Sequence, residues 1–143
     1  MLYNILLSLV LFHNSVSTVN PNISNSKQQN PLIMTDSLLK QGFIDKFHVP
    51  RDAKAEFVSR MRSNINFIKT LNGFVKNEVY WRIDENGDLI FMTIVVWENA
   101  EVLKAAKKIV QDEYKRIGFN PAEFFQKLNI RLEREEYQEY SLN

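Results

Sequence analysis

Leu-Ile-Phe-Met-Thr-Ile-Val-Val-Trp, residues 89–97, is the stretch that decides the fold. In a strand, successive side chains point to opposite faces of a sheet, and here both faces are apolar. Burying one aliphatic or aromatic side chain is worth about 1.5–3 kcal/mol, so neither face is stable in water. Helices predicted elsewhere in the chain can cover one of these faces. The other face needs a partner, and a second copy of the chain is the simplest candidate.

Working outward, four segments have strand patterns. Alternating apolar residues predict strands at 43–49, 74–83, 89–97 and 130–137. Pro50 ends the first of these. Asn86-Gly87 joins the second and third strands and predicts a hairpin with a type I′ turn, which requires positive φ angles.

Helical spacing of apolar residues predicts helices over 52–71 and 100–117, with Asp52 and Asn99 as N-caps, and a short helix after Asn120-Pro121. The resulting order, β-α-β-β-α-β, is the ferredoxin-like arrangement. We therefore expect an α+β fold with a four-stranded antiparallel sheet and helices on one face. Two such sheets packed face to face make a dimeric α/β barrel.

The composition of the 143 residues excludes several function classes. The formal net charge is +1, whereas general nucleic-acid binding requires a basic surface. Cysteine is absent, which excludes disulfides, thiolate nucleophiles and Cys-ligated zinc. His13 and His48 are the only histidines, so we expect neither a multi-histidine metal site nor any other bound metal.

Residues 1–33 are predicted to lie outside the folded domain. The apolar run at 2–12 is too short to cross a bilayer, which takes about 20 residues, so no stable membrane insertion is expected. Either residues 1–17 are a secretory signal peptide and the protein is exported, or translation starts at Met34 and the protein is cytoplasmic. The segment that follows the apolar run is rich in Ser, Asn and Gln and is predicted to be a disordered linker. The domain is expected over 41–137, followed by a frayed tail at 138–143.

Three short motifs carry a family resemblance: Phe47-His48-Val49-Pro50, Gly73-Phe74, and Val96-Trp97-Glu98-Asn99 leading into an Ala/Leu-rich helix. Together they resemble the antibiotic-biosynthesis-monooxygenase-like (ABM-like) family of dimeric α/β barrels. The resemblance implies a homodimer. The family includes enzymes that oxygenate aromatic substrates without metal or flavin, haem-degrading members and proteins of no assigned activity, so the fold restricts function only weakly.

The haem-degrading members differ from this chain at their key residues. They use an Asn on the first strand, the third-strand Trp and a His on the second long helix. The corresponding positions here are Asp45, Trp97 and the neighbourhood of Lys107, and residues 100–117 contain no His. Imidazole is the usual ligand of haem iron, so haem degradation is not expected.

Asp45 and Trp97 are the candidate catalytic residues. Asp45 interrupts an apolar alternation, so it is either a general base with a raised pKa or one half of a salt bridge, at the sheet edge or with a partner subunit. Trp97 either packs against a flat aromatic substrate and donates its N–H, or is a core residue between sheet and helix.

Aromatic side chains are the candidate substrate-binding residues: Phe47, Tyr80, Trp81 and Tyr114. Such a cluster suits a small planar apolar ligand. The resemblance then implies a cofactor-independent monooxygenase that acts on an aromatic or quinol-like molecule. The alternative is a non-catalytic small-molecule-binding or stress-related dimeric module. Convergence of Asp45 and Trp97 on one enclosed cavity would favour chemistry, whereas pairing of Asp45 with a Lys or Arg at the subunit interface would favour the binding or structural reading.

Overall fold

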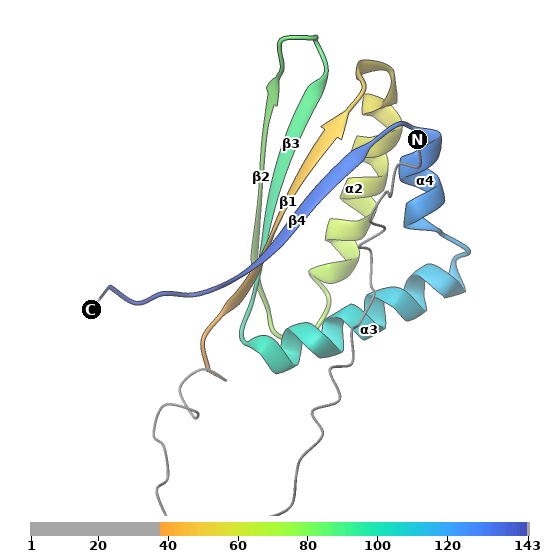
Figure 1. Cartoon of the computed structure of the whole chain (residues 1–143). Coiled ribbons are helices and arrows are strands. Elements are labelled where there is room, and N and C mark those ends of the chain that lie inside the picture. The colour runs from red at the N-terminus through yellow and green to blue at the C-terminus, as the bar shows by residue number, and fades with distance from the viewer. Residues whose placement is uncertain (1–37, 143) are drawn as a thin grey trace, which may run out of the picture.

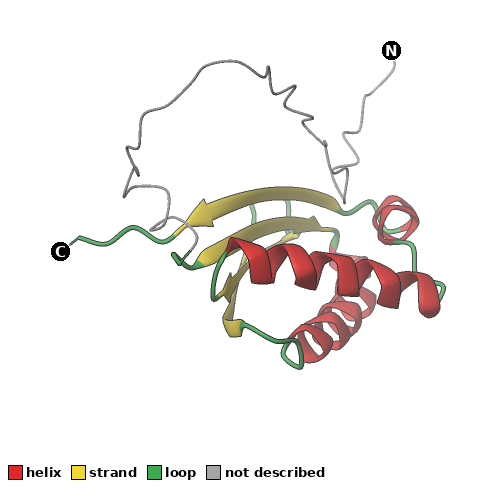
Figure 2. Cartoon of the chain, turned by 90° about the horizontal axis from the view of Figure 1, so that it is seen from below, coloured by secondary structure: helices red, strands yellow, loops and turns green. Residues whose placement is uncertain are grey.

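The computed structural model of the chain describes residues 38–142, which form one antiparallel sheet with its helices on one face (Figures 1 and 2). The strands are β1 (Gln41–Val49), β2 (Phe74–Ile83), β3 (Leu89–Trp97) and β4 (Arg131–Gln138). The helical segments are η1 (Arg51–Ala53), α2 (Lys54–Ile68), α3 (Ala100–Arg116) and α4 (Pro121–Lys127). The expected ferredoxin-like α+β fold is confirmed. The predicted leader and the alternative start at Met34 lie outside the described residues.

The strand order β2-β3-β1-β4 explains why β3 is apolar on both faces. β3 lies inside the sheet between β2 and β1, so its backbone is paired on both edges. Its odd-numbered side chains face the helices, and Leu89, Phe91, Thr93 and Trp97 among them are buried. The even-numbered side chains lie on the opposite face, which no described helix covers (Figure 2).

The core between sheet and helices has two parts. The larger cluster gathers around Phe47, Phe57 and Phe91, whose rings are in contact at 4.9 and 5.2 Å between centroids. The smaller cluster consists of Trp97, Leu103 and Ala106, where β3 meets α3. These contacts fix α2 and α3 on the sheet and leave a space between the two clusters.

The first helix begins later than the sequence indicates. The Ala53 N–H donates to the Pro50 carbonyl at 3.0 Å, so the chain enters the helix through a tight 3₁₀ turn. Asp52 lies inside this turn, and no side chain caps α2, so the predicted Asp52 cap is wrong. The other two caps are confirmed: the Asn99 side chain accepts from Val102 N–H, and the Asn120 side chain accepts from Ala122 N–H.

The β2–β3 hairpin is present, but its turn is not type I′. Gly87 has a φ of +83°, whereas Asn86 is not among the described residues with positive φ. The Asp84 carboxylate accepts hydrogen bonds from the backbone N–H groups of Asn86 and Asp88. This local side-chain bonding stabilises a longer loop in which only the glycine needs a left-handed conformation.

Gly73 lies where the backbone passes close to the start of α3. Its φ is +74°, and a Cβ at this position would lie 2.1 Å from Cγ1 of Val102. Its carbonyl accepts a hydrogen bond from the Glu98 N–H at 2.9 Å. Only a residue without a side chain satisfies both the backbone conformation and the contact.

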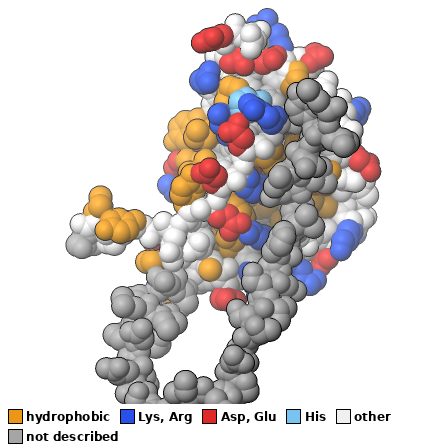
Figure 3. All heavy atoms as spheres, viewed as in Figure 1, with side chains coloured by type: hydrophobic (Ala, Val, Ile, Leu, Met, Phe, Trp, Pro, Cys, Tyr) orange, Lys and Arg blue, Asp and Glu red, His pale blue; other side chains and the backbone are white. Residues whose placement is uncertain are grey.

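The uncovered sheet face combines an apolar centre with charged edges. Ile44 on β1 and Ile90, Met92, Ile94 and Val96 on β3 alternate away from the helices. Acidic and basic side chains lie next to one another along β4 (Figure 3). Ile90 is itself buried, and the other four side chains leave an apolar strip in the middle of an otherwise polar surface.

Candidate functional site

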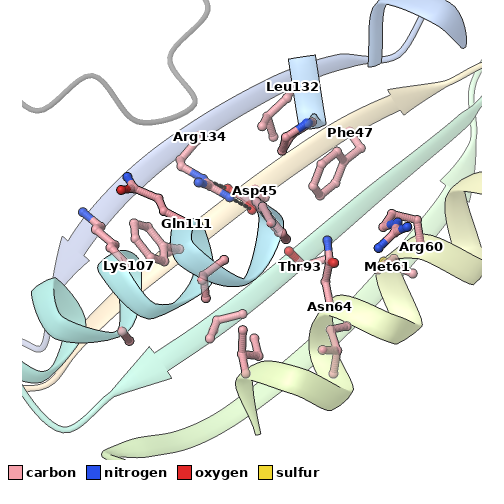
Figure 4. A pocket seen from close by; sticks show the side chains of 18 of the residues that line it. Asp45, Phe47, Arg60, Met61, Asn64, Thr93, Lys107, Gln111, Leu132 and Arg134 are labelled. Atoms are coloured by element: carbon pink, nitrogen blue, oxygen red, sulfur yellow. Dashed lines mark hydrogen bonds and ion pairs between the residues drawn. The ribbon is translucent and has the colours of Figure 1, made fainter. Parts of the chain in front are cut away.

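A cavity of about 180 Å³ lies between the sheet and the helices α2 and α3 (Figure 4). Its walls are mainly apolar and include members of both core clusters. The polar side chains that line it are Asp45, Arg60, Asn64, Thr93, Lys107, Gln111, Tyr114 and Arg134. For comparison, an apolar protein cavity of about 150 Å³ holds benzene. The space therefore suits a molecule of one or two rings.

Asp45 forms an ion pair across the sheet with Arg134. The two residues are direct partners in the β1–β4 register. Arg134 Nε donates to Oδ1 at 2.6 Å and Nη2 donates to Oδ2 at 2.7 Å, and Asp45 is only 6% exposed. Burial of the guanidinium lowers the pKa of Arg134, but the hydrogen bonds and charge of Asp45 outweigh it, so this pKa is raised overall.

The salt-bridge alternative for Asp45 is thus present, with a partner on the neighbouring strand of the same chain. A carboxylate offers about four lone-pair positions, of which the bidentate pair uses two. Each oxygen of Asp45 therefore keeps capacity for one further hydrogen bond on the cavity side.

Trp97 lies at the junction of β3 and α3 and lines the same cavity. It is 3% exposed, and the Phe74 ring meets it edge-on at 5.9 Å. Its Nε1 is buried without a hydrogen-bond partner anywhere in the described part of the chain. An unsatisfied buried donor costs about 1–3 kcal/mol, which a ligand oxygen could recover. Trp97 is thus both a core residue and a cavity wall.

Tyr114 and Phe47, two of the candidate substrate-binding residues, also line the cavity. Burial raises the pKa of the Tyr114 phenol, while the charges of Arg134 and Arg60 oppose the shift. The group is therefore a neutral hydroxyl at physiological pH, able to donate a hydrogen bond. Phe47 adds an aromatic surface next to Asp45 on the same strand face.

Tyr80 and Trp81 do not line this cavity. Both belong to β2, the edge strand farthest from β4. Tyr80 alternates onto the uncovered face and donates to Glu78, whereas Trp81 stacks on Phe91 at the margin of the helix side. Each is more than half exposed. The pleat turns Tyr80 away from the helices, and the edge position of β2 keeps Trp81 outside the site.

Arg60 and Arg134 are site residues that the sequence analysis did not single out. The signal for Arg134 was the antiparallel register, which sets it opposite Asp45. The signal for Arg60 was helical spacing, since it lies three residues after Phe57 and four before Asn64, all of which line the cavity. Charged residues in a polar segment are usually assigned to the solvent side, so neither arginine was predicted to line the cavity.

Two kinds of site are absent from residues 38–142. No group of three or more His, Cys, Asp or Glu side chains in this range is arranged to hold a metal ion. No helix in this range has the length and apolar character to cross a membrane.

No protein-family model matches the sequence, and no curated protein matches it. Solved structures do. A dimeric ferredoxin-like protein from an uncultured marine organism has a TM-score of 0.57 at 11% identity, covering 72% of this chain and 97% of that one. SnoaB, a cofactor-independent oxygenase from Streptomyces nogalater, has a TM-score of 0.55 at 20% identity over 72% of this chain and 95% of its own.

A candidate monooxygenase from Shewanella loihica PV-4 has a TM-score of 0.54 at 15% identity, covering 71% of this chain and 95% of that one. All three cover nearly their whole length, so the match extends over the complete sheet-and-helix unit rather than a fragment. At these identities the likeness establishes architecture and not activity. The chain shares its ferredoxin-like fold with these solved structures.

Proposed function

We propose that the protein is a cofactor-independent monooxygenase of the ABM type that acts on a small aromatic or hydroquinone-like molecule. The observation that carries this proposal is the convergence of Asp45, Trp97 and Tyr114 on one apolar cavity. An enclosed, mostly apolar site with a few inward polar groups is the usual form of a small-molecule site. The structural likeness to SnoaB, named as a cofactor-independent oxygenase, supports the same reading.

Three residues have distinct roles in this proposal. Asp45 accepts the hydrogen bond, and then the proton, of a phenolic hydroxyl, using the lone pairs that Arg134 leaves open. Arg134 keeps the carboxylate oriented, and its charge stabilises the electron-rich phenolate that forms. The Trp97 N–H donates to a second oxygen of the ligand, and the surrounding apolar walls exclude water.

The proposed reaction balances with O₂ as the sole oxidant. A hydroquinone and O₂ give a hydroxyquinone and one water molecule. One oxygen atom replaces a ring hydrogen as a hydroxyl group, while the hydroquinone loses two electrons and two protons to become a quinone. The second oxygen atom leaves as water, so the substrate itself supplies every electron that O₂ accepts.

We also propose that the protein is a homodimer that buries the uncovered sheet face. The apolar strip on this face includes Ile44, Met92 and Ile94, and Met92 is 39% exposed. A second copy would bring the same strip against itself in a self-complementary contact. The dimeric ferredoxin-like protein with a similar fold supports this arrangement.

The alternative function is a binding module that takes the same ligand without reaction. The Asp45–Arg134 pair favours it, because the guanidinium already occupies one lone-pair position on each oxygen of the carboxylate. Under this alternative the two residues position a ligand hydroxyl and do no proton transfer.

The test is oxygen uptake by the full chain with hydroquinone or 1,4-dihydroxynaphthalene, corrected for autoxidation. With ¹⁸O₂, the monooxygenase inserts one labelled atom into the product, which mass spectrometry detects. Ligand binding without oxygen uptake would instead establish the binding module. Hydrogen peroxide with an unlabelled quinone would replace the proposed reaction by a simple oxidation.

A further inference from the structure

Arg60 brings a positive charge to the cavity that no carboxylate in the described residues neutralises. Three basic side chains line the cavity, and two of them are paired. Arg134 pairs with Asp45, and Lys107 Nζ lies 2.6 Å from a carboxylate oxygen of Glu136. Within residues 38–142, Arg60 takes part in none of the salt bridges or hydrogen bonds. The cavity as a whole therefore carries one uncompensated positive charge.

The Arg60 guanidinium is held in place by stacking. Its Cζ lies 4.0 Å from the centroid of the Phe119 ring, and Phe119 is supported by edge contacts with Tyr114 and Phe124. Stacking uses the flat face of the guanidinium and leaves the N–H donors at its edge available. The Arg60 guanidinium is thus held at the cavity wall with its N–H donors available to a ligand.

Other unpaired polar side chains lie beside it. Asn64 follows one turn later on α2, and Figure 4 shows it extending from the helix toward Thr93 on the sheet. No hydrogen bond among the described residues involves the side chain of Asn64 or of Thr93, although Thr93 is only 6% exposed. A ligand with oxygen acceptors would satisfy both.

The positive potential of Arg60 reaches into the cavity. The Tyr114 phenol, itself buried there, has a pKa raised by burial, and the charges of both Arg134 and Arg60 act in the opposite direction. An anion near Tyr114 would therefore meet the field of two guanidinium groups, only one of which is already paired.

We infer that the cavity takes an aromatic monocarboxylate of one or two rings, with the carboxylate bound by Arg60 and the Asn64 amide. A single planar donor fork matches a carboxylate in bidentate geometry, and one uncompensated charge matches a monoanion. The apolar walls and the volume of about 180 Å³ suit the ring. This inference rests on the proposed function for the ligand's role as a substrate, but the binding step itself requires no turnover.

The test is calorimetric titration of the full chain with 4-hydroxybenzoate and with its neutral isostere, 4-hydroxybenzamide. We expect the carboxylate to bind at least about tenfold more tightly, the effect of a hydrogen-bonded charge pair. In Arg60→Gln the preference should fall to less than about twofold, and Arg60→Lys should restore part of it. Arg62→Gln, an equal charge change on the same helix outside the cavity, should keep the full preference.

Equal binding of the two ligands by the wild type would overturn the inference, and so would binding of neither. A preference that survives in Arg60→Gln would also overturn it and would assign the anion to Arg134. The outcome is separable from the proposed function. Arg60-dependent binding without oxygen uptake leaves this inference standing and removes the oxygenase, whereas uptake with neutral hydroquinone and no carboxylate preference does the reverse.

Discussion

Arg134 on β4 stands directly opposite Asp45 on β1 and donates to both oxygens of its carboxylate, at 2.6 and 2.7 Å. Two adjacent strands thus bring opposite charges together at the wall of an apolar cavity. Removing one partner of such a pair leaves the other without compensation, which costs more than the pair itself contributes. The relationship therefore links the stability of the sheet to the chemistry of the site.

Asp45→Asn should lower oxygen uptake by at least about 100-fold, because the amide cannot accept the phenolic proton. The melting temperature should fall as well, since Arg134 would be left without its carboxylate. Steady-state oxygen uptake and thermal unfolding measure the two effects. Asp112→Asn is the matched control, because this exposed carboxylate pairs with Lys108 along α3 and lies outside the cavity. Undiminished uptake by Asp45→Asn would remove Asp45 from the mechanism.

Trp97→Phe should reduce the free energy of unfolding by about 1–2 kcal/mol, the cost of a smaller ring in a packed site. It removes no protein hydrogen bond, because the indole N–H has no acceptor among the described residues. Affinity for hydroquinone should nevertheless fall about fivefold or more if the N–H binds the ligand. Chemical unfolding measures the free energy of unfolding, and calorimetry measures the affinity for hydroquinone. Trp81→Phe, at a 55% exposed side chain outside the cavity, should change neither appreciably.

Met92→Lys should convert a dimer into a monomer in light scattering of the full chain. The substitution puts a charge in the centre of the apolar strip, where the twin would bring a second one opposite it. Ile109→Lys makes the same change at a 46% exposed position on α3 and should remain dimeric. A monomeric wild type would contradict the proposed assembly.

Gly73→Ala should destabilise the protein by at least about 2 kcal/mol. The residue combines a φ of +74° with a Cβ position 2.1 Å from Val102 Cγ1, so backbone strain and a clash add. Gly87→Ala, at a φ of +83° with open space around it, should cost only about 1 kcal/mol. In a Val102→Ala background the penalty at Gly73 should shrink toward that of Gly87, as urea unfolding of the double mutant would reveal.

The charged cluster around Glu133 should make stability fall in acid. The hydrogen bond from His48 lowers the pKa of Glu133 from its ordinary 4.5; burial opposes this shift, and the charge of Lys46 adds to it. A lowered folded-state pKa contributes stability above the unfolded value, and the contribution disappears as pH falls through the folded value. The melting temperature of Glu133→Gln should therefore lie below that of the wild type at pH 6.

As the pH falls below 4.5, the difference between Glu133→Gln and the wild type should shrink. Glu85→Gln is the control, since Glu85 forms no ion pair within the described residues. A gap for Glu133→Gln that stays constant from pH 6 to pH 3 would mean that the ionised carboxylate contributes nothing to the folded state.

The strands were largely predictable because their signals are local. The alternation in β1 and the double apolar character of β3 follow from the pleat, and the caps at Asn99 and Asn120 follow from side-chain chemistry at helix starts. The start of α2 was mispredicted because a 3₁₀ turn follows Pro50 and includes Asp52. The turn at Asn86 differed because the Asp84 side chain competes for the backbone N–H groups.

Site residues that lie on one face of a single strand were predictable from the sequence. Site residues that reach the cavity through the packing of another element were not. Asp45, Phe47 and Trp97 follow from alternation in β1 and β3, and they do line the cavity. Arg60 comes from α2 and Arg134 from β4, and their presence depends on helix packing and on strand register. Helical spacing aligns Arg60 with Phe57, but spacing alone does not distinguish a cavity arginine from a surface one.

The strand order has a consequence for how the molecule is made. Among the strands of residues 38–142, β1 is synthesised first, yet its edge toward β4 stays unpaired until β4 emerges. A nascent chain can form the β2–β3 hairpin early, but Asp45 has no Arg134 until nearly the whole domain is outside the ribosome. Asp45 and Arg134 are 89 residues apart in the sequence, and contacts of such long separation slow folding. A chain that ended before residue 134 would lack the guanidinium that compensates the Asp45 carboxylate.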